Sequence, residues 1–318
     1  MSPNKYFLSG ISSCVIWGFL PIVWKMLAVY DPYEVILCRI AGAALALLLI
    51  LSVPFVFASV KRYDLQQAWH TLRTLSWQDF TRTFILSALG GVLLTSNWVA
   101  YIYVVNEVSV SAAAFAYLIM PVVTAFLALL FFRESFSRPQ WIALGLAMIS
   151  CYLLFQHISL HNMLYVCTVT LSYAVYILTQ KKNTYLPQRV NVCIQMIVGL
   201  VMMFFMMGWV DPHRPPLLQL PITFWAWIEI VALIFTVLPL LLNLYAIQGM
   251  RASQLAILVY VNPVIAFLIG VVIYGEQLRW VSAMAYALMV LAVVLFNWDL
   301  IKQLGSRDHT VERAQACK

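Results

Sequence analysis

The sequence contains very little charge. Asp, Glu, Lys and Arg together make up 10% of its 318 residues, whereas 64% are hydrophobic and the mean hydropathy is +0.90. A soluble globular domain carries roughly 25% charged and 45–50% apolar residues, so this chain has too much apolar surface for one water-facing core. The composition therefore excludes an ordinary soluble protein and indicates a chain whose solvent is lipid.

Motifs that would support an enzyme are also missing. The sequence has no phosphate-binding GxxxxGK[ST], no HExxH and no GxSxG, so neither ATP hydrolysis nor other hydrolytic chemistry is expected. His157 and His161 have the spacing of a metal site on a helix but lack a third ligand. We therefore expect no enzyme activity, no cofactor and no metal.

Long apolar runs separated by short polar stretches predict membrane-spanning helices. They lie near residues 6–29, 34–58, 83–106, 109–132, 140–157, 161–180, 190–210, 223–247, 252–274 and 280–298. The runs are too long for barrel strands. The predicted fold is an all-α membrane protein with ten transmembrane helices. The connection 59–82 is compatible either with an amphipathic helix on the membrane surface or with a solvated loop.

The basic residues predict how the chain is oriented. With alternating connections, fifteen of the 19 Lys and Arg residues fall on the side of both termini, and Arg214 and Arg279 fall on the other side. By the positive-inside rule, both termini are predicted to be cytoplasmic. The basic residues form no stripe interleaved with aromatics, so nucleic acid is not expected as a partner.

An internal repeat divides the chain. A shift of 142 residues matches Ser111 with Ser253, Pro121 with Pro263 and Glu134 with Glu276. A shift of 156 residues matches Lys25 with Lys181 more weakly. The repeat predicts a five-helix half over residues 1–158, a second over 159–298 and a cytoplasmic tail over 299–318. Because each half has an odd number of helices, the second half is inverted in the membrane, which is typical of alternating-access transporters.

Two cations lie inside predicted spans, on the side that has few basic residues. Lys25 and Arg39 are on adjacent helices, and a charge at the centre of a span costs about 2.5–3.5 kcal/mol on insertion scales. One interpretation is a cationic pocket for an anionic substrate group such as a carboxylate. The other is that both side chains reach the interface and pair with Asp31, Glu34 or Glu107.

Further polar and aromatic residues on several spans could line a shared cavity, although any one of them could equally hold two helices together. The candidate substrate-binding residues, besides the two cations, are Trp17, Asn97, Tyr101, Asn106, Tyr117, Asn243, Tyr260 and Asn262. Pro121 and Pro263 are candidate helix breaks that free backbone carbonyls, or simple packing kinks. Glu229 is the acid that lies well inside a span; it is a candidate for proton coupling, or its side chain simply reaches the lipid headgroups.

In order along the chain, several motifs resemble the drug/metabolite transporter superfamily, and within it the EamA family and its RarD-like branch. The motifs are Ile16-Trp17-Gly18 with Pro21 and Lys25, Glu34 with Arg39, Asn97-Trp98 through Val105-Asn106, Pro121 with Glu134, and Tyr274-Gly275-Glu276 after Pro263. The resemblance implies two inverted five-helix repeats, a bacterial inner-membrane location and export of small compounds. Met120 departs from this pattern, because relatives carry Asn before the proline, and this departure argues against a symmetrical two-amide site.

The sequence is thus interpreted as a secondary transporter, an exporter of small organic metabolites such as amino acids or related carboxylates. An exporter of neutral or cationic amphipathic drugs is an alternative. A non-transporting membrane sensor or scaffold is an alternative of another class. The expected partners are a small-molecule substrate and the lipid bilayer, and the expected state is a monomer.

Overall fold

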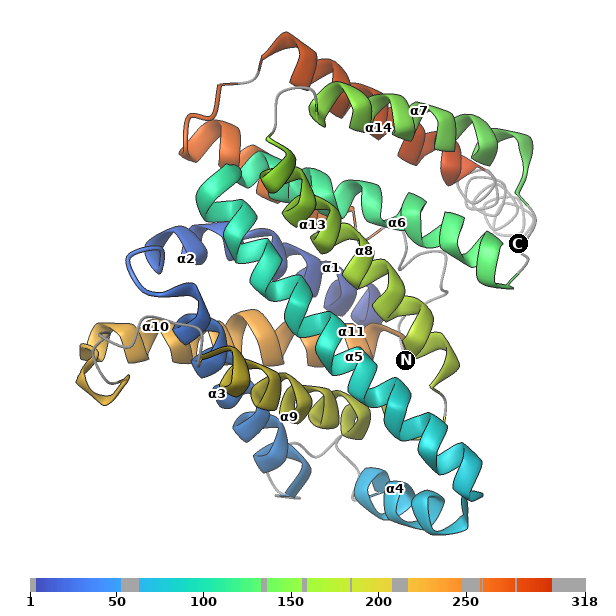
Figure 1. Ribbon diagram of the computed structural model, residues 1–318, viewed down its shortest axis with the longest axis vertical. Coiled ribbons are helices and arrows are strands. Elements are labelled where there is room, and N and C mark those ends of the chain that lie inside the picture. The colour runs from blue at the N-terminus through green and yellow to red at the C-terminus, as the bar shows by residue number, and fades with distance from the viewer. Residues whose placement is uncertain are drawn as a thin grey trace, which may run out of the picture.

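The computed structural model describes residues 4–52, 63–132, 136–155, 159–183, 185–207, 217–247, 258, 260–277 and 279–298. Within these ranges all regular elements are helices (Figure 1). The α-helices are α1 (Asn4–Gly18), α2 (Leu20–Met26), α3 (Pro32–Ser52), α4 (Tyr63–Thr74), α5 (Trp77–Tyr103), α6 (Val110–Phe132), α7 (Arg138–Phe155), α8 (Leu160–Lys182), α9 (Gln188–Met207), α10 (Ile222–Ala232), α11 (Leu238–Ile247), α13 (Val261–Leu268) and α14 (Trp280–Phe296). The π-helical turns are η1 (Val104–Val108), η3 (Leu233–Val237) and η4 (Ile269–Ile273), and η2 (Leu217–Gln219) is a short 3-10 turn.

The helices carry the apolar surface of a membrane protein. Six described segments are long and apolar enough to cross a bilayer: Lys5–Met26, Pro32–Leu51, Trp77–Val108, Leu160–Gln180, Arg189–Met207 and Ile222–Asn243. Large apolar side chains such as Phe204 and Phe205 point outward, each about 70% exposed. Lipid solvates such side chains, whereas water does not. The chain is therefore an all-α, multi-pass membrane protein.

The most extensive helix contacts follow a pattern that is preserved when the two halves of the chain are exchanged. In the repeat predicted from the sequence, α1, α3, α5, α6 and α7 correspond to α8, α9, the α10–α11 segment, α13 and α14. α5 packs on α8 as α1 packs on α11, α6 packs on α8 as α13 packs on α1, and α5 packs on α9 as α10 packs on α3. The corresponding helices α7 and α14 lie side by side (Figure 1), and α3 likewise contacts α9 and α6 contacts α13.

Contacts between segments near the helix ends identify the two ends of the helix bundle. At one end, Tyr30 packs edge-on against Phe224, with ring centroids 4.8 Å apart, and the Lys25 ammonium donates to the Asn106 carbonyl over 3.2 Å. At the other end, the Tyr185 hydroxyl donates to an Asp79 carboxylate oxygen over 3.1 Å. The residues between α2 and α3 therefore lie beside the start of α10, and α2 lies beside η1, whereas the residues between α8 and α9 lie beside the start of α5.

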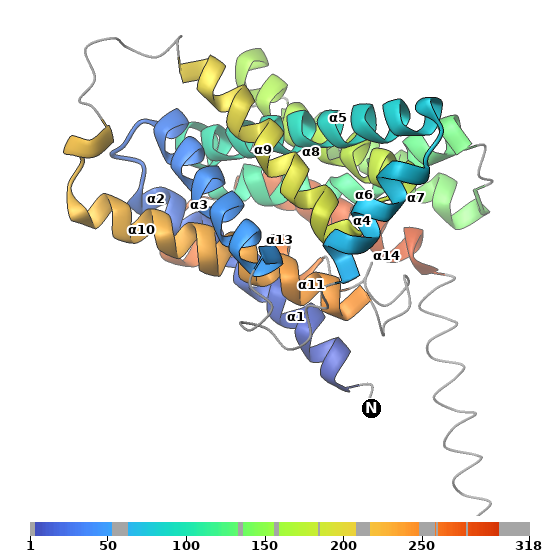
Figure 2. The same ribbon diagram turned by 90° about the horizontal axis from the view of Figure 1, so that it is seen from below.

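Part of the longest connection forms helix α4. It packs on α9 (Figure 2). Ala68 on this helix is buried, while Trp69 and Trp77 are largely exposed. The Arg73 guanidinium lies over the Trp69 ring, 4.5 Å from its centroid. The described part of this connection is therefore the amphipathic helix rather than the solvated loop.

Glycine allows α5 and α9 to approach closely. A Cβ atom added to Gly91 would lie 2.7 Å from the backbone oxygen of Gln195 and 2.8 Å from Val198 Cβ. The first of these neighbours is backbone and cannot rotate away. In contrast, a Cβ atom added to Gly145 on α7 would meet no atom within 4 Å.

We expect Gly91→Ala to lower the free energy of unfolding by about 1–3 kcal/mol, because the two helices must separate to admit the methyl group. The matched Gly145→Ala change should leave this free energy unchanged or raise it by up to about 1 kcal/mol, since alanine favours helix. Denaturant titration in detergent micelles measures both. Equal effects of the two substitutions would contradict the close contact.

Candidate functional site

Arg39 lies in the interior of the bundle. It is on the face of α3 that also carries the buried Val35 and Ala43, because residues four apart share one side of a helix. Its side chain is 3% exposed. The guanidinium carbon lies 4.2 Å from the centroid of the Trp98 ring and 5.1 Å from that of Trp24. The charge is thus held between aromatic faces, which attract cations.

The polar partner of Arg39 comes from the π-helical turn η3. The Arg39 Nε donates to the Thr236 hydroxyl oxygen over 2.8 Å, and that hydroxyl donates to the Val231 carbonyl over 2.9 Å. Single π-helical turns inside α-helices are frequent at functional sites. Because the Thr236 hydroxyl and the two indole rings are uncharged, these contacts leave the positive charge of Arg39 unneutralised.

The same turn holds Trp17. Pro239 has no backbone N–H, so the Phe235 carbonyl four residues earlier lacks its α-helical donor. The Trp17 Nε1 donates to this carbonyl over 3.2 Å. Two residues predicted from the sequence, Trp17 on α1 and Arg39 on α3, are therefore both fixed by one turn of the helix that contains Pro239.

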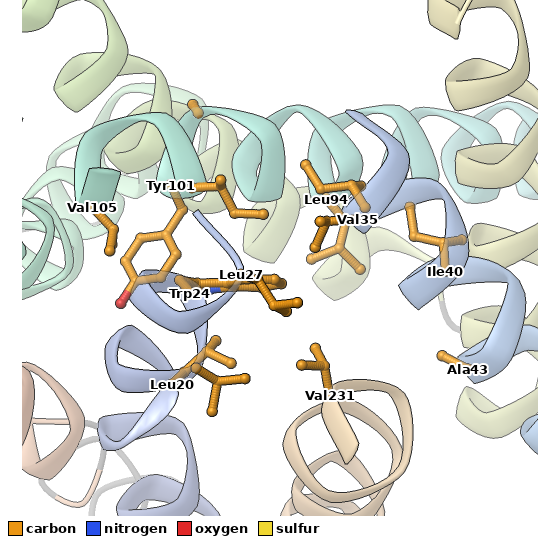
Figure 3. Packing of buried hydrophobic residues seen from close by; sticks show 14 of the residues in the cluster. Leu20, Trp24, Leu27, Val35, Ile40, Ala43, Leu94, Tyr101, Val105 and Val231 are labelled. Carbon is orange, nitrogen blue, oxygen red and sulfur yellow. The ribbon is translucent and has the colours of Figure 1, made fainter. Parts of the chain in front are cut away.

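Asn97, Tyr101 and Tyr117 also lie together. The fully buried Asn97 donates to the Val169 carbonyl over 2.7 Å and accepts from the Tyr117 hydroxyl over 2.8 Å. The Tyr101 ring meets the Tyr117 ring edge-on, with centroids 5.2 Å apart. Tyr101 and Trp24 belong to one buried cluster, and Figure 3 shows Trp24 near its centre. The predicted Asn97, Tyr101 and Tyr117 therefore meet one another in the interior of the bundle.

Lys25 is placed differently from Arg39. Its ammonium donates to the backbone carbonyl of Asn106, in η1 at the end of the bundle. The Asn106 Oδ1 atom is buried without a hydrogen-bond partner, and so is the Nε1 donor of Trp24, the residue that packs against Arg39. Lys25 and Arg39, the two cations predicted to form one pocket, therefore have different hydrogen-bond partners in the structure.

The other predicted residues lie outside this cluster. Tyr260 accepts from Asn297 Nδ2 over 3.4 Å, Asn243 lies on α11, and Glu229 is exposed on α10 beside Gly42. Asn262 is half-buried on α13. Their roles in binding, and that of Glu229 in proton coupling, stay predictions.

The two prolines differ in position. Pro121 lies inside α6, which continues through it, so the Tyr117 carbonyl lacks an α-helical donor. Pro263 is in the first turn of α13, where its missing N–H has no helical partner in any case. Glu134 and His157 lie outside the described residues. In the described ranges, no group of three His, Cys, Asp or Glu side chains could hold a metal ion.

A buried amide network was missed by the sequence reasoning. Gln180 on α8 accepts from Asn191 over 2.6 Å and from Gln195 over 2.9 Å, both on α9. Ser87 on α5 donates to Asn191 over 2.7 Å and accepts from Asn183 over 2.9 Å. The sequence did contain a signal for this network, because amide side chains in apolar helices usually bond to neighbouring helices. The shift of 156 residues that matches Lys25 with Lys181 also places Arg39 on Gln195.

Comparisons with known proteins agree with this architecture. The EamA-like transporter family model matches residues 4–156 and 161–298. The chain is similar to the uncharacterized transporter YojE of Bacillus subtilis, with 27% identity over 306 residues, 93% of this chain and 95% of the relative. It is also similar to Protein RarD of Escherichia coli, with 26% identity over 295 residues, 92% of this chain and 94% of the relative. The chain also matches a solved crystal structure with a TM-score of 0.60 and 13% sequence identity. The match covers 93% of this chain and 99% of the solved chain, and it supports the fold alone.

The contact between Arg39 and Thr236 predicts the effect of a conservative change. Thr236→Val removes the acceptor of a buried charged donor and should lower the free energy of unfolding in detergent by about 1.5–3 kcal/mol. Thr236→Ser keeps the hydroxyl and should lose much less. If denaturant titrations gave the valine and serine variants equal stability, the hydrogen bond would not hold Arg39 in place.

Proposed function

The chain belongs to the EamA-like transporter family, and from this premise we propose that it is a secondary transporter that moves small organic metabolites by alternating access. As a member of this family it is a bacterial multi-pass membrane protein of the drug/metabolite transporter type and a transporter rather than an enzyme. Our proposal adds ten spans in two inverted five-helix halves, inner-membrane location, cytoplasmic termini and net export.

Three observations support two related halves. The family model matches each half separately, the main helix contacts keep their pattern when the halves are exchanged, and Pro121 and Glu134 recur as Pro263 and Glu276 after 142 residues. Five helices per half place the second half upside down. Two inverted halves that rock against each other open a site between them to one compartment at a time.

The observation that carries the substrate class is the burial of Arg39. A guanidinium in the interior of a membrane bundle is costly, and such residues mark substrate or ion pathways by default. Its contacts with Trp24, Trp98 and Thr236 leave its charge uncompensated, and the Trp24 Nε1 beside it lacks an acceptor. An anionic group with acceptor oxygens, such as the carboxylate of an amino acid or organic acid, would neutralise the Arg39 charge and accept a hydrogen bond from Trp24 Nε1.

Lys25 contributes to this proposal from the end of the bundle. Its half-buried ammonium on the carbonyl of Asn106 is placed to attract anions toward the mouth rather than to hold them beside Arg39. Neutral or cationic amphipathic drugs fit less well. A cation that came close to Arg39 in this low-dielectric interior would be repelled.

Transport by proteoliposomes tests the substrate class. We expect exchange of L-glutamate, L-phenylalanine or succinate, and no movement of tetraphenylphosphonium. Arg39→Gln should slow carboxylate exchange roughly tenfold or more, and Arg39→Lys, which keeps the charge without the planar fork, should retain part of it. Arg73→Gln is the matched control, because Arg73 also stacks on a tryptophan but lies on the exposed helix α4.

Two results would overturn this proposal. One is carboxylate exchange by a folded Arg39→Gln protein at the unmodified rate. The other is movement of tetraphenylphosphonium but of no carboxylate, which would favour the drug-exporter alternative.

A further inference from the structure

The amino end of α6 is held by a carboxylate from a distant part of the chain. Glu276, just after η4, accepts the backbone N–H of Val110 through Oε1 over 2.6 Å and that of Ser111 through Oε2 over 2.9 Å. The next two amides are satisfied locally, since Ser109 Oγ accepts from Ala112 N over 2.9 Å and the Ser109 carbonyl accepts from Ala113 N over 3.2 Å. One carboxylate from the second half of the chain thus binds the first two amides of a helix in the first half.

The side-chain caps at the starts of α3 and α5 are local. Ser76 caps Asp79 at the start of α5, and the Asp31 carboxylate accepts from the amides of Tyr33 and Glu34 at the start of α3. Such caps persist whatever neighbouring helices do, because cap and helix move together. The cap on α6 comes from a residue 165 positions away. This cap exists only while the start of α6 stays in contact with Glu276, which follows α13 and η4 in the chain.

The chain around Glu276 is shaped for this contact. The Glu276 amide donates to the Gly270 carbonyl over 3.1 Å, which turns the chain back over η4. Gly275 has a φ of 62°, a conformation that favours glycine. A Cβ atom on Gly270 would lie 2.8 Å from Ser111 Oγ and 2.9 Å from Glu276 Oε2. Both glycines therefore allow the carboxylate to reach the end of α6.

We propose that the contact of Glu276 with the amides of Val110 and Ser111, the Glu276 latch, closes one face of the transporter and opens in each transport cycle. This inference rests on the proposed alternating access, in which the halves move relative to each other. The face is the one that the positive-inside assignment places outside the cytoplasm. The latch joins the start of α6 in one half to the residues after η4 in the other, so these two segments can separate at this face only when the latch breaks.

The strength of such a contact suits a gate. Capping a helix changes an equilibrium by roughly threefold to thirtyfold, and a negative charge at an amino end adds to this effect. That is enough to favour the closed face and small enough to be broken in every cycle. The counterparts of Glu276 and Ser111 in the repeat, Glu134 and Ser253, lie outside the described residues.

Distance measurements between two spin labels test the latch without any substrate. The labels replace the exposed Glu107 and Arg279, on the two sides of the latch, in the full chain in lipid nanodiscs with the native cysteines changed to alanine. We expect a short and a long distance. Glu276→Gln, which loses the charge, should raise the ratio of long to short roughly tenfold. Gly270→Ala should shift it in the same direction without a change of charge.

Asp31→Asn is the matched control. It neutralises a carboxylate that caps a helix on the same face from within its own segment, so it should lower thermal stability and leave the label distances unchanged. The latch would be a static cap, and the proposal overturned, if Glu276→Gln and Gly270→Ala lowered stability with unchanged distances. An equal shift by Asp31→Asn would overturn it too.

The same preparation separates this inference from the substrate proposal. A distance shift in Glu276→Gln together with no exchange of any carboxylate would support the latch and remove the assigned cargo. Carboxylate exchange that depends on Arg39, together with label distances that never change, would keep the cargo and overturn the latch.

Discussion

The buried guanidinium of Arg39 constrains much of the structure around it. A charge in a lipid-solvated bundle requires partners from several helices, and here they come from α2, α5 and η3. The partner on η3 requires a helix that departs from α geometry and contains Pro239, whose missing N–H also frees the carbonyl that holds Trp17. Arg39 and Trp17 thus tie α3 and α1 to the same π-helical turn between α10 and α11.

The two halves share a pattern of helix contacts but differ in the chemistry at equivalent positions. Where the first half has Trp24 and Arg39, the second has Gln180 and Gln195, which bond to each other over 2.9 Å. The first arrangement leaves a positive charge and an indole donor without acceptors, whereas in the second the amides largely satisfy one another. An anionic substrate between the halves would therefore be bound with its charged end toward the Arg39 side.

Much of the fold followed from the sequence, because apolar runs of span length can only be helices in lipid. The sequence placed Arg39 inside a span but left open whether it lines a pocket or reaches the interface, and the structure buries it on a helix face with Val35 and Ala43. The separation of Lys25 from Arg39 did not, since it depends on the rotation of α2 against η1. Thr236 and Gln195 were missed for a related reason: which polar side chains meet is decided by helix crossings and π-turns, and neither leaves a strong local pattern.

The length of the segment Trp77–Val108 sets how the protein sits in its bilayer. Its 32 residues give a rod of about 48 Å, whereas the hydrocarbon core is about 30 Å thick. Ordinary tilts of about 20° shorten the projection by only a few ångströms, so the amino-terminal turns must emerge from the hydrocarbon. Trp69 on α4 and Trp77 at the start of this segment are exposed, and tryptophan is a residue type enriched at membrane–water interfaces.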